Sequence, residues 1–354
     1  MLLKPATRQM FVDLKYGLKA CNRLRNDNRD DEFLVSRIIF LTTYNTNVNI
    51  EEQIDKHHLA ENINHNINRH ASFCVEKKKK KHSEDPMRDL ALVETLKLLF
   101  NLSHFCPQRS KAFTPAISHI ITILCKHSFS SEQPLQAPIG SLINSLINLD
   151  LRSDDALHAM FPRSDHKAFA ERLSVLLGLA VRGYKEEELE QQASALVILV
   201  RKVYEFAPKD AKAFMKSLIL PSDDDRQKPL GLTDTLPSRL LKLSTSPLAP
   251  QMREEISNLL FEMSNKDART FVKNVGYGFA SGFLFQHNVP IPENALDAWS
   301  NGEGDARSST SSNKRSINPI TGQRTEFEPK FDDSEMTQEE KENEAERLFV
   351  LFER

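Results

Sequence analysis

The sequence predicts an all-α protein: an armadillo- or HEAT-like α-solenoid, then a flexible linker and a C-terminal helix. Glycine is scarce, at 11 of 354 residues, whereas strand-rich domains usually need more turn glycines. Apolar residues recur at helical spacing between the prolines, and no segment alternates as a strand would. Similar runs also recur, since Asn101 in LLFNLS and Asn148 in SLINL stand 47 positions apart. That interval is at or just above the armadillo and HEAT period, which predicts stacked helical repeats.

Bulk composition excludes several classes of protein. Hydrophobic residues make up 40% of the chain, enough for a large core, and the formal charge of −2 argues against bulk binding to nucleic acid. The first residues are too short and broken for a signal sequence, and no uncharged apolar run reaches membrane-spanning length. The four cysteines are scattered, without a CxxC pair, as expected of reduced core residues in a cytosolic protein.

The first predicted helix covers residues 33–41, with Asp30 and Asp31 as its caps. An Asn- and His-rich stretch with weak apolar periodicity follows over 45–70, and then a lysine run over 77–81, which is most simply a solvated loop. A strong helical pattern begins at Pro86, which suits a first turn, and continues to Pro107. The further predicted helices are 112–126, 139–149, 167–181, 186–206, 211–220, 250–263 and 268–285. Short polar separators, such as 221–225, divide them.

The C-terminal part divides by composition. Residues 1–299 form the predicted helical body, and residues 300–316, rich in serine and without a large apolar residue, have linker composition. Residues 317–354 form a tail. Its start, Asn318-Pro319 with Gly322, is strong turn chemistry. A later helix, with a capping box at Thr337 and Glu340, would carry an apolar stripe. The stripe is Ala345, Leu348, Phe349 and Phe352, and it could dock either on the chain's own solenoid or on a partner.

Four residues of the body are candidates for binding a partner. Asn101 and Asn148 could clamp the backbone of a bound peptide, because an amide both donates and accepts; each could instead cap its own helix end. Arg37 could pair with a partner carboxylate, and Phe40 could anchor a partner side chain. The alternative for these two is an exposed arginine and a core phenylalanine.

No catalytic or cofactor motif survives inspection, so we expect neither an enzyme nor a cofactor. HExxH, GxSxG and GxxxxGK[ST] are absent, and Gly276, Gly278 and Gly282 do not have the GxGxxG spacing. Those glycines would rather permit close helix–helix approach. One cluster resembles a metal site but lacks the tight ligand pairs of zinc sites, so a polar surface helix is the preferred interpretation. The cluster is His57, His58, His65, His70 and Cys74.

Several longer motifs resemble the synembryn family, which comprises chaperones and nucleotide exchange factors for heterotrimeric G-protein α subunits. They are SRIIFLTTY at 36–44, LLFNLSH at 98–104, SLINSLINLD at 141–150, the glycine segment 275–282, INPITGQ at 317–323 and MTQEEKENEAERLFVLFER at 336–354. The resemblance implies an armadillo-like solenoid whose concave face takes up the C-terminal helix of Gα. Arg37, Phe40 and Asn101 then become groove candidates. Asn318, Pro319 and Gly322, with the helix of Leu348 and Phe349, would brace the GTPase domain.

The same resemblance implies exchange without covalent catalysis, on a GDP-bound or nucleotide-free Gα. It implies a cytoplasmic monomer, recruited at most peripherally to the plasma membrane. The chain is shorter than the family leads us to expect, which suggests missing N-terminal repeats, and its linker lacks acidic Ser/Thr phosphorylation sites. The alternative function is a solenoid scaffold or adaptor that holds a peptide in its groove without acting on nucleotide.

Overall fold

The computed structural model describes residues 4–76, 86–290 and 317–328. Within these ranges the chain is helical and has no strand, and a single isolated β-bridge joins Ile317 to Arg324. The all-α prediction is therefore confirmed. The α-helices are α1 (Pro5–Asp13), α2 (Gly17–Arg23), α3 (Arg29–Thr42), α4 (Ile50–Asp55), α5 (Leu59–Glu76), α6 (Pro86–Phe105), α7 (Thr114–Lys126), α8 (Ile139–Ile147), α9 (Asp154–Met160), α10 (Ala168–Gly183), α11 (Glu186–Phe206), α12 (Lys209–Ile219), α13 (Leu236–Leu243), α14 (Pro250–Met263), α15 (Ala268–Val275) and α16 (Tyr277–Gln286).

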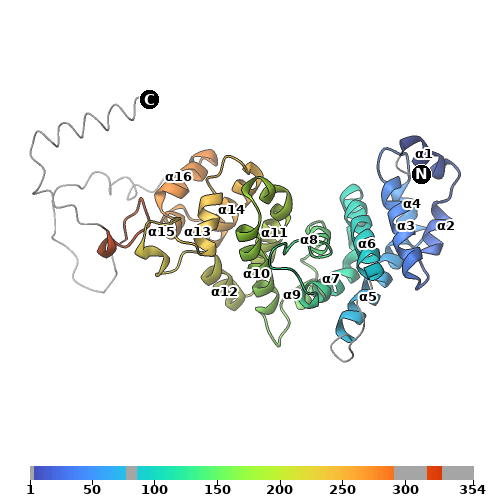
Figure 1. Cartoon of the computed structure of the whole chain (residues 1–354), viewed down its shortest axis with the longest axis horizontal. Helices are drawn as coiled ribbons and strands as arrows, with labels where there is room; N and C mark the ends of the chain where they lie inside the picture. The colour runs from blue at the N-terminus through green and yellow to red at the C-terminus, as the bar shows by residue number, and fades with distance from the viewer. Residues whose placement is uncertain (1–3, 77–85, 291–316, 329–354) are drawn as a thin grey trace, which may run out of the picture.

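The helices stack in two rows along an elongated body (Figure 1). In one row α3, α6, α8, α11 and α14 pack successively against one another, and in the other α5, α7, α10 and α12 do so. The apolar faces between the rows form one continuous core, in which residues such as Leu99, Leu146 and Leu259 are fully buried. This is the α-solenoid that the repeated motifs predict, because no single helix pair could bury its apolar face alone.

Several boundaries agree with the sequence prediction. Helices α11 and α14 have the predicted ends, and α6 begins at Pro86. The predicted cap of the first long helix is wrong. Helix α3 begins at Arg29, and Asn28 is its cap, accepting hydrogen bonds from the backbone N–H groups of Asp30 and Asp31. The two aspartates instead occupy the first turn, where their charge suits the positive end of the helix dipole.

The predicted helix over 268–285 is also wrong, since it is two helices, α15 and α16. Gly276 separates them with φ of +81°, a left-handed value that ends the first helix. A Cβ at Gly276 would stand 3.0 Å from the carbonyl oxygen of Ile320. The glycine therefore does permit a close approach, but by the backbone of the C-terminal turn rather than by another helix.

Most of the helices that the sequence prediction missed are short. Helices α1, α2, α4, α9 and α13 have six to nine residues each, too few for an apolar pattern to repeat over several turns. Helix α5 lies largely within the Asn- and His-rich stretch. Its buried positions include Asn62, Asn66 and His70 beside Ile63 and Ile67, so the polar residues conceal the stripe.

A buried ionic network joins α3, α5 and α6. The carboxylate of Glu32, which is fully buried, lies 3.0 Å from Nε2 of His70, accepts a hydrogen bond from Thr95 at 2.8 Å, and pairs with Arg69. Burial alone would raise the pKa of Glu32, but the hydrogen bond and charge of His70, with Thr95 and Arg69, hold it below its usual range. His70 is thus a buried structural residue, and the surface location expected for its cluster is wrong at this position.

Replacing Glu32 by glutamine is expected to lower the free energy of unfolding at pH 7 by about 3 kcal/mol, because it leaves the Arg69 guanidinium and the His70 imidazole without their buried carboxylate partner. The folded-state pKa of Glu32 is depressed, so its contribution is complete above its unfolded pKa of about 4.3 and is lost as the pH falls through the folded value. The difference in unfolding free energy between parent and variant should therefore shrink as the pH falls below about 4.3.

The matched control is Glu61→Gln, because Glu61 is an exposed partner of His58. Its effect should stay within about 0.5 kcal/mol at every pH. A Glu32→Gln deficit that remained constant down to about pH 3 would contradict the assignment of Glu32 as the ionised centre of the network.

Candidate partner-binding surfaces

A pocket of about 250 Å³ opens between α3, α6 and α8. Its lining is mostly aromatic and amide, with one cation. The lining residues are Phe40, Tyr44, Leu96, Lys97, Phe100, Asn101, Ser141 and Asn144. Apart from Tyr44, which follows the end of α3, these come from three consecutive helices of one row, so the stacking of the solenoid creates the pocket. It brings Phe40 and Asn101 together, and their role in binding a partner stays a prediction.

Aromatic side chains continue from the pocket along α6. The ring of Tyr44 meets that of Phe40 edge-on at 5.2 Å and that of Phe105 at 6.3 Å, and Phe100 stacks on His104 at 6.0 Å. Tyr44 is 38% exposed and Phe105 46% exposed. We call the pocket and this aromatic edge the aromatic groove. Rigid, partly exposed aromatic rings are the side chains that most often anchor a protein partner.

Asn101 lies in the wall of the aromatic groove and is 4% exposed. Its Nδ2 donates to the hydroxyl of Thr43 at 2.7 Å, and its Oδ1 accepts from the hydroxyl of Tyr44 at 3.2 Å. It therefore does not cap its own helix. The amide holds Tyr44 in place and has one further N–H to donate, so binding of a peptide carbonyl by Asn101 stays a prediction.

Charged side chains border the aromatic groove. Nη1 of Arg37 lies 3.3 Å from Oε1 of Glu94, and Nζ of Lys97 lies 2.9 Å from the same oxygen. Arg37 and Lys97 are each about half exposed, whereas the Glu94 side chain is 5% exposed. Two cations thus share one carboxylate, which leaves an excess positive charge on the rim. That charge would favour an acidic group of a partner.

Asn148 is not part of this pocket. It is the C-cap residue of α8, and its Nδ2 is buried without a hydrogen-bond partner in the described part of the chain. The repeat relation between Asn101 and Asn148 therefore does not extend to a shared site, and a binding role for Asn148 stays a prediction. The same helix contributes Asn144 to the pocket instead, one turn earlier.

The second candidate surface begins with the tail turn, which we define as residues 317–324. The turn packs on the body, because the N–H groups of Tyr277 and Leu230 donate to the carbonyls of Pro319, at 2.7 Å, and Thr321, at 3.0 Å. The N–H of Gly278 donates to Ile320 at 3.2 Å, at the break between α15 and α16. The start of the tail thus folds back on its own solenoid.

Arg226 is the centre of this attachment and was missed by the sequence analysis. It is 6% exposed, and burial lowers the pKa of its guanidinium. Nη1 donates to the carbonyl of Gly322 at 2.9 Å, and Nη2 donates to those of Asn274 at 2.8 Å and Lys273 at 3.2 Å. Arg226 directly follows residues 221–225, which the sequence analysis treats only as a polar separator between helices. The adjacent opposite charges of Asp225 and Arg226 are the one feature of the sequence that could have drawn attention to this position.

Asp225 holds the loop that presents Arg226. One carboxylate oxygen accepts from the backbone and hydroxyl of Ser222, and the other from the hydroxyls of Thr233 and Thr235. Burial alone would raise the pKa of Asp225, but these hydrogen bonds hold it below its usual range. These hydrogen bonds fix the loop in the conformation from which Arg226 binds the tail turn.

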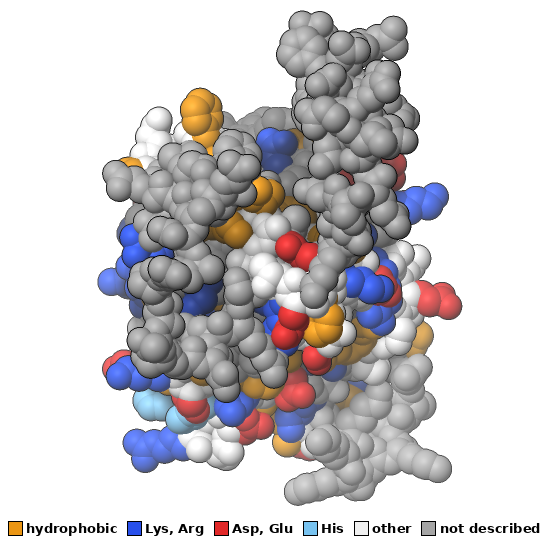
Figure 2. Space-filling view, turned by 90° about the vertical axis from the view of Figure 1, so that its left-hand side faces the viewer, with side chains coloured by type: hydrophobic (Ala, Val, Ile, Leu, Met, Phe, Trp, Pro, Cys, Tyr) orange, Lys and Arg blue, Asp and Glu red, His pale blue; other side chains and the backbone are white. Residues whose placement is uncertain are grey.

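The predicted turn residues build the tail turn itself. Oδ1 of Asn318 accepts from the N–H groups of Ile320 and Thr321, and Gly322 adopts a φ of +68°. A Cβ at Gly322 would stand 2.4 Å from Cδ1 of Leu230, so any other residue would have to displace that side chain as well as adopt a strained backbone conformation. Pro319 and Ile320 are partly exposed and could meet a partner. Figure 2 views this end of the molecule, where acidic and basic side chains intermingle among the described residues.

The remaining tail predictions lie outside the described residues. They are the linker over 300–316 and the helix that would carry Leu348 and Phe349. The structure therefore does not test the division of the chain at 299 and 316, or the bracing role of that helix.

Comparison with known proteins adds an independent line of evidence. A family model described as guanine nucleotide exchange factor synembryn matches residues 1–354. The chaperone Ric-8A of Pongo abelii is 26% identical over 272 residues, which cover 74% of this chain and 51% of the relative. The chaperone Ric-8A of Mus musculus is 27% identical over 273 residues, with the same two shares. A synembryn-like chaperone of Schizosaccharomyces pombe is 34% identical over 150 residues, 40% of this chain and 28% of the relative. The chain thus spans about half the length of the Ric-8A proteins that it matches.

Proposed function

Because this chain belongs to the synembryn family, we propose that it is a guanine nucleotide exchange factor and folding chaperone for heterotrimeric G-protein α subunits. Apart from family membership, the structural observation that supports this proposal is the aromatic groove. It offers exposed rings beside an excess of positive charge, on successive helices of one solenoid row. Such a surface suits an amphipathic helix with acidic residues, laid with its apolar side in the groove.

The proposed mechanism needs no covalent step. A protein that binds the nucleotide-free GTPase better than the GDP-bound form shifts the population toward nucleotide release. Drawing the C-terminal helix of Gα into the aromatic groove would loosen the nucleotide pocket to which that helix leads. The same affinity for an open, incompletely folded Gα would serve chaperoning. The tail turn would set the direction in which the rest of the tail leaves the body toward the GTPase domain.

The proposed setting is the cytoplasm, with peripheral recruitment to the plasma membrane, and the proposed working form is a monomer bound to one Gα. No helix in the described part of the chain is long and apolar enough to cross a membrane.

Uptake of a non-hydrolysable GTP analogue by purified, GDP-loaded Gα tests the proposal directly. We expect this protein to accelerate uptake several-fold over Gα alone and to co-purify with Gα when GDP is removed. Excess GTP analogue should release the complex, because the exchange factor prefers the empty state. An unchanged uptake rate together with no co-purification would refute both the exchange and the chaperone proposals.

A scaffold or adaptor is the second candidate, because the aromatic groove could bind an amphipathic helix without any effect on nucleotide. Deleting residues 329–354 separates the two while retaining the tail turn, which the body needs for its own hydrogen bonds. A scaffold would still bind its partner, with unchanged affinity, after this deletion. An exchange factor braced by the tail would bind the isolated Gα C-terminal peptide normally but lose most of its acceleration.

A further inference from the structure

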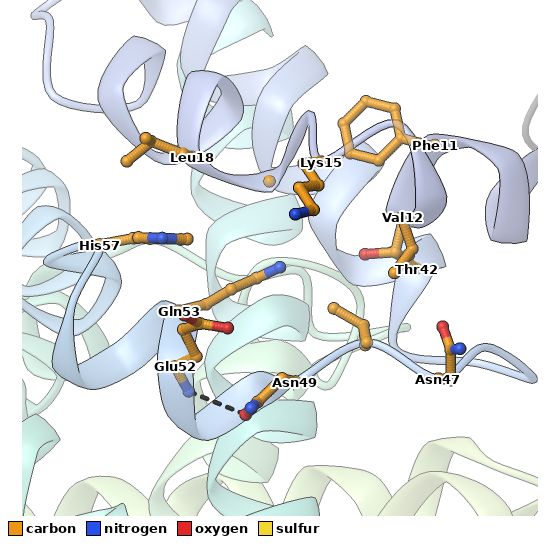
Figure 3. Close-up of a pocket in the computed structure, with 12 residues that line it drawn as sticks. Phe11, Val12, Lys15, Leu18, Thr42, Asn47, Asn49, Glu52, Gln53 and His57 are labelled. Carbon is orange, nitrogen blue, oxygen red and sulfur yellow. Dashed lines mark hydrogen bonds between the residues drawn. The ribbon is translucent and has the colours of Figure 1, made fainter.

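A second cavity, of about 370 Å³, lies at the amino-terminal end of the body (Figure 3). Helices α1, α2 and α4 surround it, with Thr42 at the end of α3 and the loop over 47–49 completing the wall. It shares no lining residue with the aromatic groove. Its volume falls within the range of small-molecule sites in proteins.

The side-chain amide of Gln53 lines this cavity. The residue is 8% exposed, and its amide makes no hydrogen bond among the described residues. Nδ1 of His57 is also unpaired there, but this atom is enclosed and does not open to the cavity. Gly17 gives the amide its room, since a Cβ there would stand 2.8 Å from Nε2 of Gln53. The Gln53 amide therefore has donors and an acceptor available for a molecule bound in the cavity.

The polar side of the cavity presents hydrogen-bond donors and one positive charge. Lys15 stands exposed at the rim, and its ammonium has no carboxylate partner among the described residues. Figure 3 shows the side chains of Lys15, Gln53 and His57 converging on one space. Glu52 also lines the cavity, but Nζ of Lys56 lies 3.3 Å from its Oε1 and offsets its charge. Convergent N–H donors with a free ammonium favour an anion that accepts several hydrogen bonds.

The opposite wall is apolar. It consists of Phe11, Val12, Leu18 and Val48, and Leu18 is 46% exposed. An inorganic anion would leave this wall in water, whereas an apolar group against it would remove that surface from water. We propose that the cavity binds a small organic anion, a carboxylate on an apolar body. Lys15 and Gln53 hold the carboxylate, and Phe11 and Leu18 cover the apolar body.

Isothermal titration of the full chain with phenylacetate tests this site. Phenylacetamide, which is neutral and has the same shape, should bind at least about tenfold more weakly, because it cannot make charge-assisted hydrogen bonds to Lys15. Inorganic phosphate should also bind at least about tenfold more weakly, since it gains nothing from the apolar wall. Lys15→Gln and Gln53→Leu should each weaken phenylacetate by about tenfold, and Glu52→Gln should strengthen it.

Lys19→Gln is the matched control, because Lys19 lies on α2 but does not line the cavity, and it should leave binding within about twofold. Lys15 is exposed, so its variant keeps the fold even where Gln53→Leu fails to do so, and a thermal melt confirms this for each variant. If titration with phenylacetate gave no binding heat, the proposal would be overturned. Equal binding of the amide would overturn the choice of an anion, and equal binding of phosphate would overturn the apolar body.

Discussion

Replacing Arg226 by methionine is expected to lower the free energy of unfolding by about 4 kcal/mol, because hydrogen bonds from a charged group each contribute about 1.5–3 kcal/mol. The guanidinium donates to the carbonyls of Gly322, Asn274 and Lys273, and methionine leaves all three without that partner. Methionine fills much of the same space, so the loss would come from hydrogen bonding rather than from a cavity. Urea unfolding monitored by circular dichroism measures the change.

Hydrogen exchange gives the Arg226 prediction a local signature. The N–H groups of Tyr277, Gly278 and Leu230 donate to the tail turn, so their protection should fall in the variant while that of α6 stays unchanged. Arg269→Met is the matched control, because Arg269 is an exposed residue of α15 and makes no hydrogen bond to the tail turn among the described residues. Its effect should stay within about 0.5 kcal/mol. Equal losses in both variants would contradict the central role of Arg226.

Removing two exposed rings of the aromatic groove, Tyr44→Ala with Phe105→Ala, is expected to weaken binding of nucleotide-free Gα by at least about a hundredfold. Truncating an aromatic anchor at the centre of an interface costs about 2 kcal/mol or more, and each factor of ten corresponds to about 1.4 kcal/mol. The rings are 38% and 46% exposed, so the fold should tolerate their loss. Exchange acceleration at limiting concentration should fall in proportion.

The control for the groove variant is the pair Leu248→Ala with Val175→Ala. These apolar side chains are 55% and 47% exposed and lie outside the groove lining. Their loss should leave both affinity and exchange within about twofold of the parent. A groove variant that kept full affinity for Gα, with an unchanged melting temperature, would place the Gα contact elsewhere on the solenoid.

The helices that the sequence predicts best are those whose start and apolar periodicity are both visible in the local sequence. Helix α11 and helix α14 each combine several apolar turns with a proline or acidic start, so their ends can be read from the residues alone. The predicted helix over 268–285 fails for the opposite reason. Gly276 breaks it because a turn from far along the chain needs the space, and local periodicity carries no trace of that neighbour.

Some features of the candidate sites can likewise be predicted from the local sequence, whereas others depend on the tertiary structure. Residue type and spacing alone determine the α-solenoid, the turn chemistry of Asn318 and Gly322, and the family to which the chain belongs. Only the tertiary structure decides that Asn101 accepts a hydrogen bond from Tyr44, and that Arg226 donates to the carbonyl of Gly322, 96 residues away. The physical reason is that a turn satisfies its own backbone geometry, whereas a buried amide or guanidinium must find its partners on whichever segments the stacked helices bring beside it.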